Sequence, residues 1–148
     1  MLVFTYAYYS KKAAADETRF KTSKQKMRDS IALLGNQLDD ATYFSLNRNE
    51  NAKEYLEISD ATEIVSKITD QIMDHNVNPK GNILVPYDPM YDQRYIINKV
   101  KVLNHRWVIA DFSDGKVWGE LLLKYFIEED GSITFERLDS QLYQPTVY

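Results

Sequence analysis

The residues with the clearest chemical potential in this sequence lie on either side of one Asp-Gly turn. Asp111 precedes the turn and Glu120 follows it, with Trp107 and Trp118 close to them in the chain. Two neighbouring carboxyls beside indole rings can divide acid and base roles, because repulsion and desolvation separate their pKa values. Asp111 and Glu120 are therefore the candidate catalytic pair of an acid–base site.

Four other side chains could complete this site as ligand-binding residues: Trp107, Trp118, Tyr125 and His105. The same pattern also fits an ordinary solvated sheet face, on which polar residues alternate with apolar ones. His75, the other histidine, is expected at a helix C-terminus, where a positive charge is favourable without any catalytic role.

Several kinds of site are excluded by residue type. The chain has no cysteine, which rules out disulfides, Cys-based zinc sites, iron–sulfur clusters and thiol nucleophiles. Its two histidines are too few for a histidine-rich metal site. No phosphate-binding loop, dinucleotide fingerprint, calcium loop or nucleophile elbow occurs in the sequence. We therefore expect neither a metal nor a cofactor.

The composition is that of a globular protein. The 148 residues suit one domain, and 44% are hydrophobic, enough for a core. The net charge of −4 argues against nucleic acid as a partner, since phosphate binding requires a basic surface.

Residues 1–12 form an apolar and then basic leader. The nine residues MLVFTYAYY are too few to span a bilayer, which needs about 20. Three hypotheses fit the leader: a first helix or strand of the domain, the stub of a longer membrane anchor, or a contact with a membrane surface. Both cytoplasmic and membrane-anchored locations stay open. The remaining residues, 13–148, are expected to form a single domain.

Helical periodicity dominates the first half of that domain. Phe20, Met27, Ile31 and Leu34 recur at multiples of three and four, which predicts a helix over 16–36 that ends at Gly35-Asn36. A shorter helix is expected over 50–57. A third begins near Asp60, with Glu63 completing a capping box, and ends near His75.

Strand patterns dominate the second half. A short strand is expected at 83–85, followed by longer ones at 95–103, 106–112, 117–127 and 133–143. A two-residue loop at Asp114-Gly115 would pair Asp111 with Trp118 and make Asp111 and Glu120 diagonal neighbours. It also predicts one wholly apolar face, formed by Val108, Ala110, Phe112, Val117, Gly119 and Leu121.

The last hairpin has two possible registers. A two-residue loop would place Lys124 opposite Arg137, which is repulsive. A three-residue loop of residues 129–131 instead pairs Lys124 with Glu136 and Tyr125 with Phe135. We favour the second register, because a shift of one residue moves every side chain to the other face.

Helices followed by a long antiparallel meander predict an α+β fold, with N-terminal helices on a curved sheet of four to five strands. This order resembles the NTF2-like and cystatin-like rolls over about residues 18–143. The segment from Trp107 to Leu121 is also similar to small uncharacterised bacterial proteins of membrane-anchored type. The roll resemblance implies a cone-shaped pocket and functions that range from isomerases and dehydratases to accessory domains.

Three functional hypotheses follow. The first is a non-enzymatic accessory or binding domain, tethered to a membrane through its N-terminus. The second is a small hydrolase, isomerase or dehydratase that uses Asp111 and Glu120, with Tyr125 or His105 nearby. The third is a homodimer formed through the face of Trp107 and Trp118, since exposed aromatic faces mark interfaces.

Overall fold

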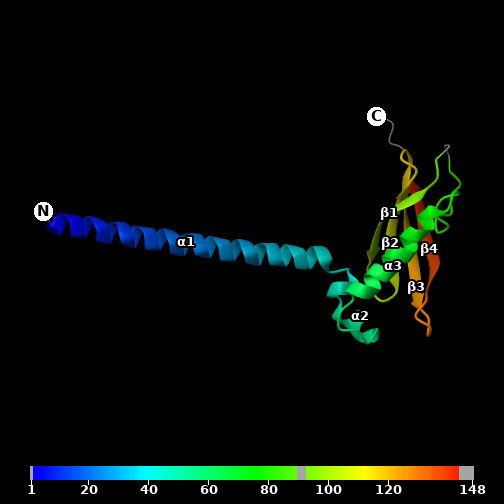
Figure 1. The fold of residues 1–148 in the computed structure, drawn as a ribbon, viewed down its shortest axis with the longest axis horizontal. Coiled ribbons are helices and arrows are strands. Elements are labelled where there is room, and N and C mark those ends of the chain that lie inside the picture. The colour runs from blue at the N-terminus through cyan, green and yellow to red at the C-terminus, as the bar shows by residue number, and fades with distance from the viewer. Residues whose placement is uncertain (1, 90–92, 144–148) are drawn as a thin grey trace. The chain divides into compact units, whose positions relative to one another are not determined.

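The computed structural model describes residues 2–89 and 93–143. Within them the α+β class is confirmed: helices come first and an antiparallel sheet follows (Figure 1). The elements in chain order are α1 (Leu2–Thr42), η1 (Leu46–Arg48), α2 (Glu50–Tyr55), α3 (Thr62–Asp74), η2 (His75–Val77), β1 (Ile96–Val102), β2 (Trp107–Ser113), β3 (Trp118–Ile127) and β4 (Ile133–Tyr143). Two compact units divide the chain, Met1–Thr42 and Tyr43–Tyr148.

The first unit is the single helix α1. It is longer at both ends than the predicted helix at 16–36. The leader is helical from Leu2, while Met1 lies outside the described residues. The predicted stop at Gly35-Asn36 is wrong, because one glycine costs a helix only about 1 kcal/mol and the helix formers around it continue to Thr42. No helix among the described residues has both the length and the apolar content needed to cross a bilayer.

The short helices of the second unit are stabilised by side-chain caps at or near their starts. Asn49 accepts a hydrogen bond from the backbone N–H of Ala52 and caps α2, confirming a helix in the predicted range 50–57. The expected capping box of Asp60 and Glu63 does not form. Asp60 instead accepts hydrogen bonds from the N–H and hydroxyl of Thr62, and α3 begins at that residue.

The sheet has four antiparallel strands in the order β1-β2-β3-β4, confirming the long strands predicted after residue 95. The strand predicted at 83–85 is absent. The buried Asn82 accepts a hydrogen bond from Leu84 N–H through its side chain and one from Val85 N–H through its carbonyl, so the segment turns instead.

The β2–β3 hairpin has a longer loop than predicted. Asp111 lies opposite Glu120, and Ser113 opposite Trp118. The carboxylate of Asp114 accepts hydrogen bonds from Lys116 N–H and Val117 N–H, which stabilises a four-residue loop. The register is therefore two residues away from the prediction. A shift of two preserves the faces, so the predicted apolar face is correct.

The β3–β4 hairpin has the predicted three-residue loop. Lys124 lies opposite Glu136, and Tyr125 opposite Phe135. Gly131 has a φ of 78°, a left-handed conformation that glycine adopts without steric cost, and its N–H bonds to the Glu128 carbonyl.

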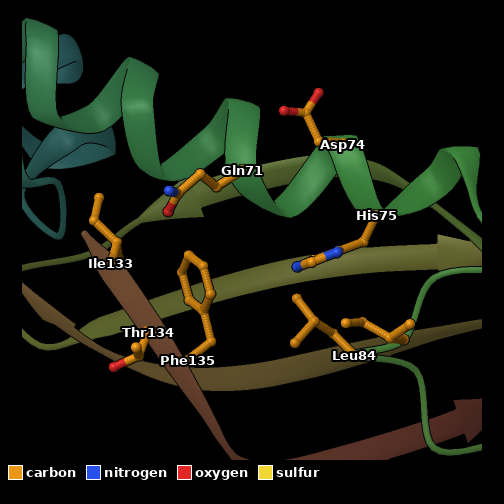
Figure 2. A pocket seen from close by; sticks show the side chains of 8 residues that line it. Gln71, Asp74, His75, Leu84, Ile133, Thr134 and Phe135 are labelled. Atoms are coloured by element: carbon orange, nitrogen blue, oxygen red, sulfur yellow. The ribbon is translucent and has the colours of Figure 1, made fainter.

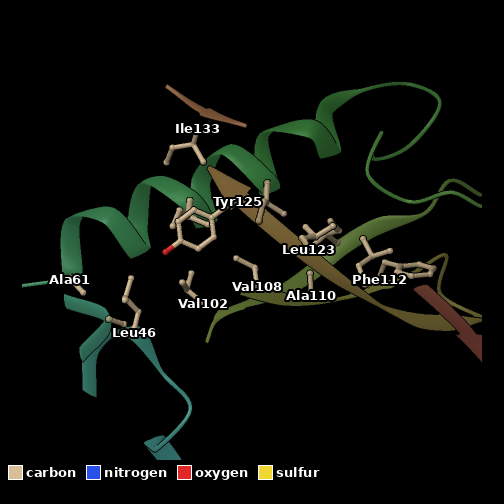
Figure 3. Close-up of a cluster of buried hydrophobic side chains, with 14 of the residues drawn as sticks. Leu46, Ala61, Val102, Val108, Ala110, Phe112, Leu123, Tyr125 and Ile133 are labelled. Atoms are coloured by element: carbon tan, nitrogen blue, oxygen red, sulfur yellow. The ribbon is translucent and has the colours of Figure 1, made fainter. Parts of the chain in front are cut away.

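The apolar face of the sheet packs against α3. Ile68 and Ile72 of α3 are fully buried, and Leu46 and Ala52 extend the same core towards η1 and α2. Figure 3 shows strand side chains of the same buried cluster, which include Val102, Val108, Ala110, Phe112, Leu123 and Tyr125. The alternate side chains of β2 and β3 lie on the opposite face.

Gly119 lies where the backbone of β4 and the ring of Phe112 leave no room for a side chain. A Cβ there would lie 2.3 Å from the Gln141 carbonyl oxygen and 2.4 Å from Cζ of Phe112. We expect Gly119→Ala to lower the free energy of unfolding by about 2–3 kcal/mol, measured by urea denaturation followed by circular dichroism. Gly35→Ala, in α1 with no atom within 4 Å of the new Cβ, is the control and should leave the sheet unit unaffected. Equal midpoints for Gly119→Ala and wild type would contradict this packing.

Candidate functional site

The predicted carboxylate pair forms on the sheet face opposite α3. We call this surface the open face. It is formed by Trp107, Ile109, Asp111 and Ser113 of β2, Trp118, Glu120, Leu122, Lys124 and Phe126 of β3, and their outward neighbours on β1 and β4. Asp111 and Glu120 are direct cross-strand partners rather than diagonal neighbours, because the hairpin loop is longer than expected.

Among the described residues, a neutral group donates a hydrogen bond to each carboxylate of the pair. The side-chain amide of Asn98 lies 3.4 Å from Oδ2 of Asp111 and also donates to Ser113 Oγ at 3.1 Å. The Tyr143 hydroxyl donates to Oε2 of Glu120 at 3.0 Å, and this hydrogen bond raises the pKa of Tyr143. Like charges directly opposite each other destabilise a sheet, so these donors offset part of a real repulsion.

Exposed aromatic rings flank the pair along the strands. The Trp118 ring packs on that of Tyr143 with a centroid distance of 4.4 Å. Trp107 lies towards the other end of the face, opposite Lys124. The two tryptophans are 48% and 49% exposed, which is unusual for the residues with the largest apolar surface.

Tyr125 and His105 do not lie with the carboxylates. Tyr125 faces the core, and its hydroxyl donates to the Asn104 carbonyl oxygen at 2.9 Å. His105 lies in the turn between β1 and β2 and packs on the Tyr55 ring, 4.4 Å between centroids. These two predicted ligand-binding residues instead line a separate small cavity of about 150 Å³, together with Tyr55 and Arg106.

Burial controls the titration of this second cluster. Desolvation, and then the nearby Arg106 guanidinium, lower the pKa of His105. Its Nδ1 is buried and has no hydrogen-bond partner among the described residues. Desolvation also raises the pKa of Tyr125 to about 12, although Arg106 opposes the shift. Both groups are therefore held in their neutral forms near pH 7.

A second cavity, which the sequence did not reveal, lies between α3 and the start of β4. Its volume of about 460 Å³ is within the range of small-molecule pockets. Figure 2 shows Gln71 and His75 on one side and Leu84, Ile133 and Phe135 on the other. Oε1 of Gln71 is buried without a hydrogen-bond partner in the described part of the chain, so it could accept one from a small, largely apolar ligand.

The pocket escaped sequence analysis because its walls come from segments about 60 residues apart, and no local motif joins them. The described residues contain no group of three or more Asp, Glu, His or Cys side chains placed to hold a metal ion.

No protein-family model matches this chain, and neither a curated protein nor a solved structure matches it.

The lowered pKa of His105 predicts a specific dependence of stability on pH. Its pKa in the folded state is below the ordinary 6.5, so the unfolded state takes up a proton first as the pH falls. The contribution of neutral His105 to the free energy of unfolding is thus fully present above pH 6.5. It is lost as the pH falls from there towards the pKa of His105 in the folded state. We expect His105→Gln to lose less stability than wild type between pH 7 and pH 5, measured by thermal melts. An NMR titration midpoint for His105 at or above 6.5 would contradict this.

The facing carboxylates predict a gain in stability when one charge is removed. We expect Glu120→Gln to raise the free energy of unfolding by about 0.5 kcal/mol, because the cross-strand repulsion disappears. Asp111→Asn should give a smaller rise, because it also removes an attraction to Lys99, the partner of Asp111 on β1. Glu136→Gln is the matched control: Glu136 faces Lys124, so its neutralisation should lower stability slightly or leave it unchanged. Urea denaturation at low salt measures all three, and a loss of stability in both members of the pair would refute the repulsion.

Proposed function

We propose that this chain is a non-enzymatic binding domain that recognises a protein partner through the open face. One observation carries the proposal: three aromatic side chains, Trp107, Trp118 and Tyr143, are exposed on a sheet face that also holds two facing carboxylates. Tryptophan and tyrosine are enriched at protein interfaces and dominate binding energies there.

The aromatic rings supply the affinity. Each tryptophan exposes about half of its surface. Burying that exposed half under a partner contributes roughly 2–3 kcal/mol to the binding free energy. Ile109, Leu122 and Phe126 lie on the same face and extend the apolar contact. Covering these apolar side chains with a partner therefore lowers the free energy of the complex.

The carboxylates supply the specificity. Asp111 and Glu120 place two negative charges between the tryptophans, and Lys99, opposite Asp111 on β1, offsets part of them. A further cation placed there relieves the remaining repulsion. An arginine or lysine of the partner suits this position, because charge-assisted hydrogen bonds to carboxylates are the strongest in proteins. The partner segment should therefore carry a basic residue between apolar ones.

The spacing of the tryptophans sets the length of that segment. Trp107 and Ser113, which lies opposite Trp118, are six residues apart on β2. At about 3.3 Å per residue this is roughly 20 Å. An extended segment with apolar residues about six positions apart, and an arginine or lysine between them, matches the face.

The acid–base hypothesis uses the same two carboxylates. A pocket enzyme would require further groups at the pair, whereas Tyr125 faces the core and His105 lies in the β1–β2 turn. Binding of a partner uses both the carboxylates and the exposed aromatic rings of the open face, so we prefer this function to acid–base catalysis.

Peptide display on the full-length chain tests the proposal, with binding followed by tryptophan fluorescence. The sequence has two tryptophans, and both lie on the open face, so their emission reports on it directly. We expect selected peptides to be rich in arginine or lysine beside apolar residues, and to shift the emission to shorter wavelength.

Matched variants separate recognition from folding. Asp111→Asn combined with Glu120→Gln should weaken peptide binding by about tenfold or more, although it stabilises the fold. Glu54→Gln combined with Glu63→Gln removes the same charge from exposed helix positions and should leave binding unchanged. Peptides that bind without changing the tryptophan emission, or that bind both double variants equally, would refute the open face as the recognition surface.

A further inference from the structure

Taken by itself, the helix α1 has none of the packing that normally stabilises a helix. It has 41 residues, and every side chain from Phe4 to Ala41 is exposed. Helices in proteins depend on tertiary packing of an apolar face far more than on intrinsic propensity. The large exposed apolar side chains of α1 from Phe20 onwards are Phe20, Met27, Ile31, Leu33, Leu34 and Leu38, each 58–68% exposed.

Most of these side chains follow a seven-residue repeat. From Phe20 to Ala41, steps of four and three residues lead through Lys24, Met27, Ile31, Leu34 and Leu38. We call this set of seven positions the seam. Its mean period of 3.5 residues is that of a left-handed coiled coil, whereas a helix packed on a globular core follows 3.6. The seam ends towards the N-terminus at Glu17, which is charged.

We propose that the seam binds a second copy of this chain, forming a parallel two-stranded coiled coil through α1. Ile31 occupies an a position and Leu34 a d position, the combination that favours two parallel strands. Lys24 is the one polar residue of the seam, and a single lysine at an a position typically fixes register and strand number at some cost in stability.

The area of the seam is sufficient for such a dimer. Its five large apolar side chains bury roughly 100 Å² each, about 500 Å² per helix before the flanking side chains are counted. Stable interfaces bury about 800 Å² per partner, so the flanking positions need to supply the smaller share. Leu33 lies outside the seam, at a c position, and would stay exposed in the dimer.

Dimerisation would give the assembly two open faces. If those faces bind as proposed above, two linked sites raise the avidity for a partner with repeated segments. The coiled coil itself is independent of that proposal, because it depends on α1 alone.

Adjacent leucines give a matched pair of variants for the first test. Sedimentation equilibrium of the full-length chain should show a dimer at micromolar concentration. We expect Leu34→Glu to raise the dimer dissociation constant by about 100-fold or more, because two buried side chains are lost per dimer. Leu33→Glu makes the same substitution one residue away and should leave the constant within about threefold of wild type. Near-ultraviolet circular dichroism confirms that the sheet unit is intact in both variants.

Cysteine cross-linking tests whether the two α1 helices are parallel. No other thiol can react, because the chain has no cysteine of its own. Lys24→Cys, near one end of the seam, should form an intermolecular disulfide on oxidation only if the helices are parallel and in register. Lys26→Cys lies outside the seam and should cross-link far more slowly.

Three results would overturn the proposal. One is a full-length chain that stays monomeric at about 100 μM. A monomer that binds anionic phospholipid vesicles through α1, detected by flotation, counts as the same result. The second is equal weakening by Leu33→Glu and Leu34→Glu. The third is a dimer that survives Leu34→Glu but dissociates in Trp118→Ala, which would place the contact on the open face.

Discussion

The sheet unit is organised by the packing of α3 on one face of its four strands. Ile68 and Ile72 are fully buried in one hydrophobic cluster with Val108, Ala110 and Phe112 of β2. Because strand side chains alternate strictly, burying one set commits the other set to the opposite face. The open face, with its tryptophans and facing carboxylates, is therefore a direct consequence of where the helix lies.

Two amide side chains, the half-buried Asn76 and the buried Asn82, hold the end of α3 against the edge of the sheet. Asn76 makes two hydrogen bonds with the backbone of Ile97, donating to its carbonyl at 2.8 Å and accepting from its N–H at 2.9 Å, as a neighbouring strand would. Asn82 donates to the Ile72 carbonyl and to Asn76, both within 2.9 Å. A buried polar group left unpaired costs free energy, so the four bonds strongly favour this position of the helix.

Local patterns in the sequence were enough for most of the fold. The alternation in β2 and β3 assigned each residue to the correct face, and the repulsion between Lys124 and Arg137 selected the correct register for the last hairpin. The first hairpin differed because Asp114 accepts two backbone N–H groups, which a rule based on Asp-Gly turns does not include. The segment 83–85 differed because Asn82 is buried, a property that depends on the whole fold.

For the candidate site, the sequence by itself determined that Asp111, Glu120 and the two tryptophans share one face, since two-residue periodicity depends only on position in the strand. Tertiary structure decided the rest. It placed Asp111 directly opposite Glu120, placed His105 at a separate cavity beside Tyr55, and formed the pocket at Gln71 from segments distant in the chain. The physical reason is that periodicity is a local property of the backbone, whereas register, burial and cavities arise only when distant segments pack together.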